Sequence, residues 1–182
     1  TPPTDAGTYQ VSISGSGDDC YRSFTALRDE SWTFTISPAS VTPPAAVIGL
    51  VYNGETQTGV VLPENALFTL TGNTAKNAGE YTATASLLSK RNYVWSDGTS
   101  DDKRIEWSIA RASVTPPAAV TGLVYNGETQ TGVVLPENAL FTLTGNTAKN
   151  AGEYTATASL LSKQNYVWAD GTSDDKQIAW SI

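Results

Sequence analysis

The feature that most constrains this chain is a near-identical internal repeat. The stretch YNGETQTG occupies residues 52–59 and returns 73 positions later at residues 125–132. Around it, residues 41–109 and 114–182 differ at five of 69 aligned positions. The five pairs are Ile48/Thr121, Arg91/Gln164, Ser96/Ala169, Arg104/Gln177 and Glu106/Ala179. Two such copies within 182 residues predict small separate folding units instead of one large domain.

A third, divergent copy of the second half of the repeat opens the chain. DAGTYQVSI at residues 5–13 resembles NAGEYTATA at residues 77–85, and WTFTI at residues 32–36 resembles IEWSI at residues 105–109. In WTFTI, Trp32, Phe34 and Ile36 alternate with threonine, so we expect these three side chains to face inward.

The repeats predict three segments. Residues 1–40 form a partial, C-terminal half-unit, and residues 41–112 and 113–182 each form a β repeat domain. The joints between them are SPASVTPP and ARASVTPP, whose Pro-Pro pairs fix φ. We therefore expect stiff joints in an end-to-end array.

Period-two patterns predict strands within each repeat. In residues 81–88, Tyr81, Ala83, Ala85 and Leu87 alternate with threonine and serine. In the closing segments, KRIEWSI and KQIAWSI, the substitutions fall at alternate residues while Trp107 and Trp180 are retained. Both tryptophans are therefore predicted to face the core.

The YNG stretch predicts a turn. Asn-Gly suits positive φ, an apolar β-branched segment precedes it at residues 47–52, and residues 55–62 return after it, which predicts a hairpin. Each repeat then holds about six short strands with turns at short intervals, which is typical of a small β-sandwich. The fold class is all-β, with tandem Ig-like sandwich domains as the prediction and a β-grasp-like variant as the alternative.

These segments together resemble a known family. The succession YNGETQTG, NAGEYTATASL and NYVWSDGTSDDKRIEWSI is similar to the bacterial immunoglobulin-like or MBG-type repeats. Those repeats occur in tandem in large surface proteins, mostly of Gram-positive bacteria. The resemblance implies an exported, cell-surface or cell-wall-associated all-β array without chemistry of its own.

Composition excludes several classes of function. A net charge of −7 and a pI near 4.4 argue against a nucleic-acid partner. The fragment has no apolar run long enough to insert into a membrane. It also lacks methionine, so we expect a mature or excised piece of a longer chain whose export signal lies outside it. As part of that longer chain it is expected to be a monomer.

Catalytic residues are scarce. The chain has no histidine and one cysteine, Cys20, whose thiolate is disfavoured by the neighbouring Asp18 and Asp19. No nucleophile is paired with a base, so we expect no enzymatic activity.

Loop aromatics form one candidate ligand site. Tyr93 with Trp95, and Tyr166 with Trp168, stand beside Asp-Gly turns and could stack on a glycan. The alternative is that each tryptophan covers a small core.

Aspartates form a second candidate site. DGTSDD supplies Asp97, Asp101 and Asp102 in the first copy and Asp170, Asp174 and Asp175 in the second, and calcium prefers such oxygen ligands. The spacing does not match an EF-hand loop, and Asp beside Gly is also ordinary turn chemistry. The sequence therefore leaves both readings open, with no other cofactor expected.

A covalent cross-link is a further alternative. Lys103 and Lys176 open the last strands, and each would need Asn53 or Asn126 beside a buried acid to form an isopeptide bond. Such a bond would remove one ammonia per unit.

Two roles follow from these observations. The first is a structural spacer or stalk that projects or supports an adhesive region, because near-identical units on stiff joints convert copy number into length. The second is an adhesin module that binds glycan or host protein through the loop aromatics or an exposed strand edge.

Overall fold

All regular elements in the described chain are β-strands. The structure, a computed structural model, describes residues 2–20 and 22–182. Sixteen strands in that part of the chain form several small sheets, which confirms the all-β class. Among the same residues, no helix has the length and apolarity needed to cross a bilayer.

Contacts group the chain into two compact units. One comprises Thr1–Ala46, Val60–Asn73 and Thr82–Ile105, and the other comprises Val47–Gly59, Thr74–Tyr81 and Glu106–Ile182. The boundary between them passes through the first repeat. The three segments at residues 1–40, 41–112 and 113–182 remain a prediction.

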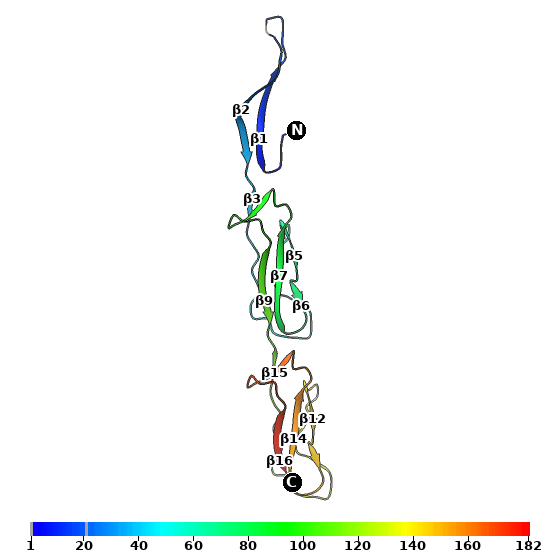
Figure 1. Cartoon of the computed structure of the whole chain (residues 1–182). Helices are drawn as coiled ribbons and strands as arrows, with labels where there is room; N and C mark the ends of the chain where they lie inside the picture. The colour runs from blue at the N-terminus through cyan, green and yellow to red at the C-terminus, as the bar shows by residue number, and fades with distance from the viewer. Residues whose placement is uncertain (1, 21) are drawn as a thin grey trace. The chain divides into compact units, whose positions relative to one another are not determined.

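The opening half-unit is an antiparallel ribbon of β1 (Gly7–Gly15) and β2 (Phe24–Ile36), which run side by side in Figure 1. Its Tyr9 and Phe34 rings stack with centroids 5.5 Å apart. Trp32 and Phe34 remain 37% and 44% exposed. The inward orientation expected for both is wrong, because no segment among the described residues covers this face of β2.

The two repeats carry matching strands. The first repeat contains β3 (Ala39–Val41), β4 (Gln57–Thr58), β5 (Phe68–Thr71), β6 (Thr74–Ala75), β7 (Gly79–Leu87), β8 (Tyr93–Trp95) and β9 (Lys103–Ile109). The second contains β10 (Ala112–Val114), β11 (Gln130–Thr131), β12 (Phe141–Thr144), β13 (Thr147–Ala148), β14 (Glu153–Leu160), β15 (Tyr166–Trp168) and β16 (Lys176–Ser181).

Each repeat is built on a three-stranded sheet and two strand pairs. In the second repeat, β14 lies between β12 and β16 and is antiparallel to both (Figure 1). β10 pairs with β15 in parallel, and β11 pairs with β13. The sheet orders of the first repeat, β5-β7-β9, β3-β8 and β4-β6, are the same.

The core of the second repeat forms on the inward side of β14. Alternation places Ala156, Ala158 and Leu160 on this side, with 0%, 0% and 7% of their surfaces exposed. Trp168 packs in one cluster beside Ala158, and Trp180 packs in another beside Ala156. Small side chains in the central strand thus leave room for two indoles.

The last glycine of YNGETQTG lies directly against an indole. A Cβ on Gly132 would lie 1.8 Å from Cε3 of Trp180, and one on Gly59 would lie equally close to Trp107. Trp107 and Trp180 are 3% and 5% exposed, which confirms their predicted inward orientation. The glycine therefore recurs because the packed tryptophan leaves no space for a side chain.

The five substitutions between the copies avoid the core. All ten side chains at the differing positions are exposed, including Glu106 and Ala179 on the closing strands. Packing density explains this restriction, since even one added methylene strains a well-packed interior. The differences between the copies therefore lie on the solvent-exposed surface of the repeats.

The YNG stretch makes its turn with only part of the predicted hairpin. Gly54 adopts a φ of +85°, as an Asn-Gly turn requires. Ala46, just before the first arm, forms an antiparallel bridge with Val60, and the Val47 N–H donates to the Gly59 carbonyl at 2.7 Å. Farther along the first arm, Val51 bridges in parallel to Ala110. The predicted hairpin is therefore limited to the base of the arms, because pairing with other segments replaces pairing between the arms nearer the turn.

The connectors belong to the repeats. The Ala-Ser-Val of SPASVTPP forms β3, which pairs in parallel with β8, and the same residues of ARASVTPP form β10, which pairs with β15. Pro43-Pro44 and Pro116-Pro117 follow these strands. Hydrogen bonding to the repeat therefore orders each connector in addition to any stiffness from proline.

Candidate functional site

The indoles offered as glycan platforms are buried. Trp95 is 0% exposed and packs against Phe68 with ring centroids 5.6 Å apart, and Trp168 is 1% exposed. Their Nε1–H groups donate to the backbone carbonyls of Asp101 and Asp174, at 2.7 Å each. Stacking on a sugar needs an open ring face, so these indoles serve as parts of the core instead.

The neighbouring tyrosines are half-buried. Tyr93 packs against the cluster that contains Trp95. Tyr166 meets Tyr52 edge-on, with centroids 5.4 Å apart and an interplanar angle of 86°. Burial, followed by the nearby Tyr52, raises the pKa of Tyr166 above its ordinary value of 10.0. Both tyrosines thus contribute to internal packing.

The six candidate calcium ligands are engaged separately. Asp97 accepts hydrogen bonds from Thr99 and Lys103, and Lys103 is the main reason that the pKa of Asp97 lies well below its usual range. Asp102 forms an ion pair with Lys90 at 3.1 Å. Asp101 contributes its backbone carbonyl to Trp95.

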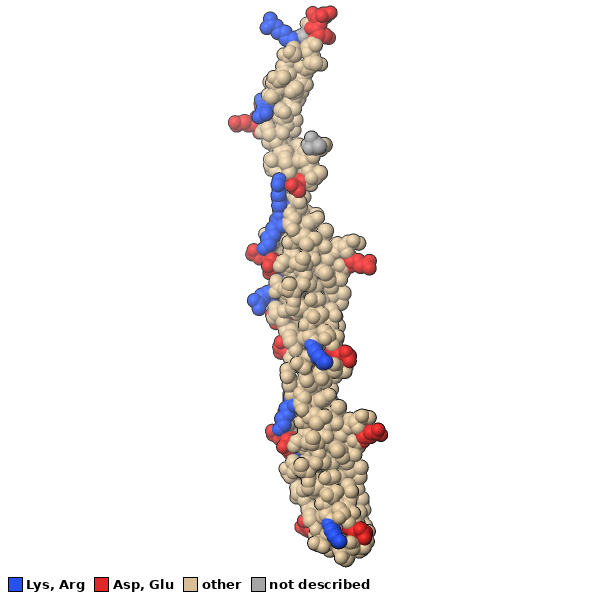
Figure 2. Space-filling view, turned by 90° about the vertical axis from the view of Figure 1, so that its right-hand side faces the viewer, with Lys and Arg blue, Asp and Glu red and all other residues tan. Residues whose placement is uncertain are grey.

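The second copy repeats this arrangement. Asp170 pairs with Lys176, Asp175 pairs with Lys163 at 3.1 Å, and Asp174 contributes its backbone carbonyl to Trp168. In the described part of the chain, no three acidic or cysteine side chains gather in a way that could hold a metal ion. Figure 2 shows basic and acidic side chains interspersed on the face in view, as such pairs require.

The remaining reactive residues lie apart. Cys20 is an exposed free thiol, and its backbone N–H donates to Asp18 Oδ1 at 2.8 Å. In the second repeat, Lys176 contacts Asp170, while Asn126 Oδ1 accepts the Glu128 N–H at 2.9 Å. The two residues proposed for an isopeptide bond in this repeat are therefore each engaged with a different partner.

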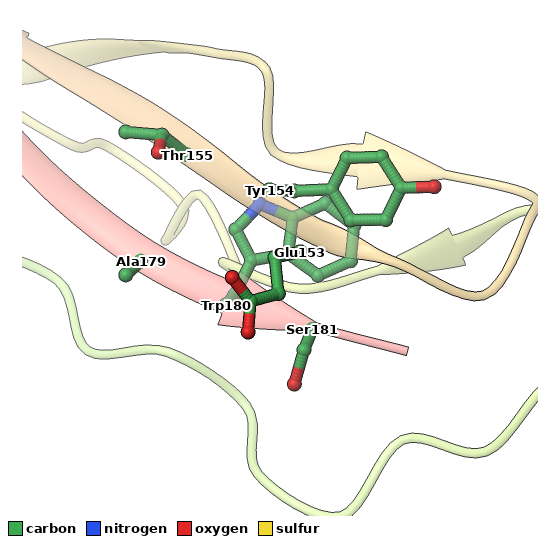
Figure 3. A pocket seen from close by; sticks show the side chains of 6 residues that line it. All are labelled: Glu153, Tyr154, Thr155, Ala179, Trp180 and Ser181. Atoms are coloured by element: carbon green, nitrogen blue, oxygen red, sulfur yellow. The ribbon is translucent and has the colours of Figure 1, made fainter.

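A shallow hollow lies at the end of the β14–β16 pair. It has a volume of about 570 Å³ and is lined by the six residues labelled in Figure 3. Glu153 and Ser181 are cross-strand partners there, and the Tyr154 ring stacks on Trp180 at 4.7 Å. The lining residues supply one carboxylate, from Glu153, and the hydroxyl groups of Tyr154, Thr155 and Ser181.

The most specific polar arrangement is a joint between the ribbon and the first repeat. The Ala6 N–H donates to Asn92 Oδ1 at 2.8 Å, and Asn92 Nδ2 donates to Asp5 Oδ1 at 2.8 Å. The backbone carbonyl of Asn92 accepts the N–H of Ala39 at 2.8 Å. One asparagine thus connects the ribbon, the turn before β8 and the connector strand β3.

The same joint recurs between the two repeats. The Ala78 N–H donates to Asn165 Oδ1 at 2.9 Å, and Asn165 Nδ2 donates to Asn77 Oδ1 at 3.2 Å. The Asn165 carbonyl accepts the N–H of Ala112 at 2.8 Å. Asn165 is 8% exposed, so its amide is buried with its hydrogen-bonding groups satisfied, as burial of a polar group requires.

The two joints differ in one flanking pair. At the first, Arg91 donates to the Ala6 carbonyl at 2.9 Å and lies 3.4 Å from the Asp5 carboxylate. At the second, Gln164 replaces the arginine and Asn77 replaces the aspartate. A cavity of about 260 Å³ lined in part by Gln164 remains there. Both flanking residues are therefore charged at the first joint, and both are neutral at the second.

Sequence reasoning missed the two joint asparagines. The sequence did reveal the loops that they bind, because Asp-Ala-Gly at residues 5–7 aligns with Asn-Ala-Gly at residues 77–79. Their partners lie 86 and 87 positions away along the chain, and no local period connects such residues.

Comparison with known proteins gives no relative: no protein-family model, no curated protein and no solved structure matches this chain.

Proposed function

We propose that the chain is a structural spacer, made of bacterial immunoglobulin-like repeats of the MBG type, in an exported cell-surface protein. In this proposal the repeats are small β-sandwiches that project or support an adhesive region. The observation that carries it is the recurrence of one joint, in which Asn92 and Asn165 make the same contacts with Ala6 and Ala78. Because the same contacts recur at both joints, successive units would follow one another in a defined arrangement.

The five differences between the two repeats agree with a role that depends on the fold. A catalytic or ligand-binding surface constrains exposed side chains, whereas a spacer constrains its core and its joints. All the differences between the copies are exposed. The function we infer is therefore mechanical and not enzymatic.

Small-angle X-ray scattering tests the spacer. The test compares the present chain with one extended after Ile182 by a copy of residues 110–182. Strands of eight or nine residues predict that the maximum dimension grows by about 25–30 Å for the added unit. A chain that folds the added unit back on the others, with no growth in the maximum dimension, would contradict the proposal.

One observation favours adhesin-type binding as a second role. The β1–β2 ribbon exposes Phe24, Trp32 and Phe34 by 46%, 37% and 44%. Exposed aromatics of this kind suit contact with a glycan or a host protein. A glycan array probed with the intact chain and with Trp32→Ala tests it. We expect the variant to lose binding, and equal signals from both proteins would remove the ribbon from consideration.

A further inference from the structure

The chain contains a third copy of the loop used in both joints. Residues 150–152 repeat the Asn-Ala-Gly of residues 77–79 and correspond to Asp-Ala-Gly at residues 5–7. In the first two copies, joint contacts bury the central alanine: Ala6 is 6% exposed and Ala78 is 5% exposed. Ala151 is exposed, and in the described part of the chain no acceptor lies on its N–H.

The third loop already has the backbone that a joint needs. Gly152 exchanges two hydrogen bonds of 3.0 Å with Ile182, which fixes the loop to the end of the closing strand. The Tyr154 hydroxyl donates to the Asn150 carbonyl at 2.8 Å, as the Tyr81 hydroxyl does to Asn77. The loop is therefore held in the same way in the engaged copy and in the exposed one.

We propose that residues 150–152 form a docking site for a further repeat unit of this kind. The occupant is the turn Ser-Lys-x-Asn that precedes β8 and β15, in a unit that follows Ile182. Its asparagine would accept the Ala151 N–H on Oδ1 and donate Nδ2 to Asn150, as Asn165 does with Ala78 and Asn77. This inference rests on the proposed role as a spacer and names the partner that extends it.

The engaged joints also indicate which unit fits. An aspartate in the loop pairs with Arg91 at the first joint, and an asparagine in the loop faces Gln164 at the second. Asn150 is neutral, so the loop matches a unit with glutamine at the position of Gln164. A free second copy of the chain offers no vacant turn, because Asn92 and Asn165 are both engaged within it.

Amide hydrogen exchange read by NMR tests the docking site. The proteins are the present chain and the chain extended after Ile182 by a copy of residues 110–182, which preserves the spacing of the repeat. Closing the joint should slow exchange at Ala151 by at least about tenfold, toward the rate of Ala78, since a buried hydrogen bond must open before exchange. An Ala151 rate unchanged by the extension would overturn the proposal.

A matched variant isolates the asparagine. Asn165→Ala in the added copy alone should return Ala151 to the fast rate of the present chain. As a control, the amide of Ala156 and that of its equivalent in the added copy must both stay protected from exchange. Their protection shows that the added unit is folded. Protection of Ala151 that survives this substitution would also overturn the proposal, because a different contact would then be responsible.

Charge gives a further arm. The residues of the first joint are rebuilt by Asn150→Asp in the present chain combined with Gln164→Arg in the added copy. We expect the Ala151 amide to exchange more slowly still at low salt in this extended variant. Exchange no slower than in the neutral extended chain would contradict the pairing rule. Scattering and exchange are separate readouts: growth in length without protection at Ala151 would remove this joint and leave the spacer in place.

Discussion

The β1–β2 ribbon and the β14–β16 pair are similar antiparallel strand pairs, but in the described part of the chain only the second is covered by another segment. Tyr9 stacks on Phe34 at 5.5 Å and 28°, and Tyr154 stacks on Trp180 at 4.7 Å and 29°. Phe34 is nevertheless 44% exposed, whereas Trp180 is 5% exposed. Only the complete repeat supplies the first-half segment that ends at Gly132 and closes over the indole.

The difference shows that strand pairing and burial are separable in this repeat. The aromatic pair forms across two strands whether or not a second layer is present. A two-stranded ribbon by itself is marginally stable in water. The ribbon therefore depends on its joint, where Asn92 and Arg91 contact Asp5 and Ala6.

Truncating the aromatic residue in each ladder gives the largest expected contrast. Trp180→Ala should lower the free energy of unfolding of the second repeat by ~3–5 kcal/mol, because it leaves a cavity in a packed core. Phe34→Ala should cost only ~0.2–1 kcal/mol, the value of an exposed cross-strand pair. Residue-resolved hydrogen exchange in β14 and β1 measures both. Equal losses would show that the ribbon is covered in solution.

Adding a methyl group under the indole tests the cover itself. Gly132→Ala should destabilise the second repeat by ~1–3 kcal/mol, because its Cβ would meet Trp180 and force the core apart. Gly59→Ala should do the same to the first repeat beneath Trp107. Urea unfolding measures the cost.

A double variant provides the control for that clash. In the double variant Gly132→Ala with Trp180→Leu, the smaller leucine makes room for the added methyl group. The double variant should therefore lose less stability than the sum of the losses in the two single variants. Strict additivity would mean that Gly132 acts through its backbone and not through contact with the indole.

The smallest expected effect is a difference in titration between the two regions. Lys176, then Thr172, lowers the pKa of Asp170 from 3.8 to about 2, while Ser31 lowers the pKa of Asp29 in the ribbon. A lowered folded-state pKa stabilises the fold above pH 3.8, and this contribution is lost as the pH falls through about 2.

Carboxyl chemical shifts measured from pH 5 to pH 1.5 report both groups. Lys176→Ala should move the midpoint of Asp170 up toward 3.8 and leave that of Asp29 in place. Both side chains face solvent, so we expect little change in stability. An Asp170 midpoint that ignores Lys176 would contradict the pairing seen in the turn.

Much of each repeat could be predicted from local pattern. Alternation in residues 81–88 and in the closing segments identified the strands and the inward indoles of Trp107 and Trp180, because a strand's side-chain period is fixed at two. The same rule failed for Trp32 and Phe34. Alternation defines a face of a strand, but it does not say whether another layer exists to cover that face.

The candidate sites were less predictable. Trp95 stands in a loop-like stretch, yet it lies on β8 beside the connector strand β3, which turns its ring into the core. The aspartates of DGTSDD were grouped by sequence, but the Asp97 and Asp102 carboxylates pair with two different lysines, Lys103 and Lys90. Distances between side chains depend on tertiary placement, which spacing along the chain does not fix.

The sequence by itself determined the repeat, the all-β class and the closing strands with their inward tryptophans, because these follow from local periodicity and copying. Only the tertiary structure decided that the connectors pair in parallel within the repeats, that the opening ribbon is uncovered and that Asn92 and Asn165 hold the joints. Those contacts join residues far apart in the chain, and their existence depends on which surfaces remain for neighbours to bury.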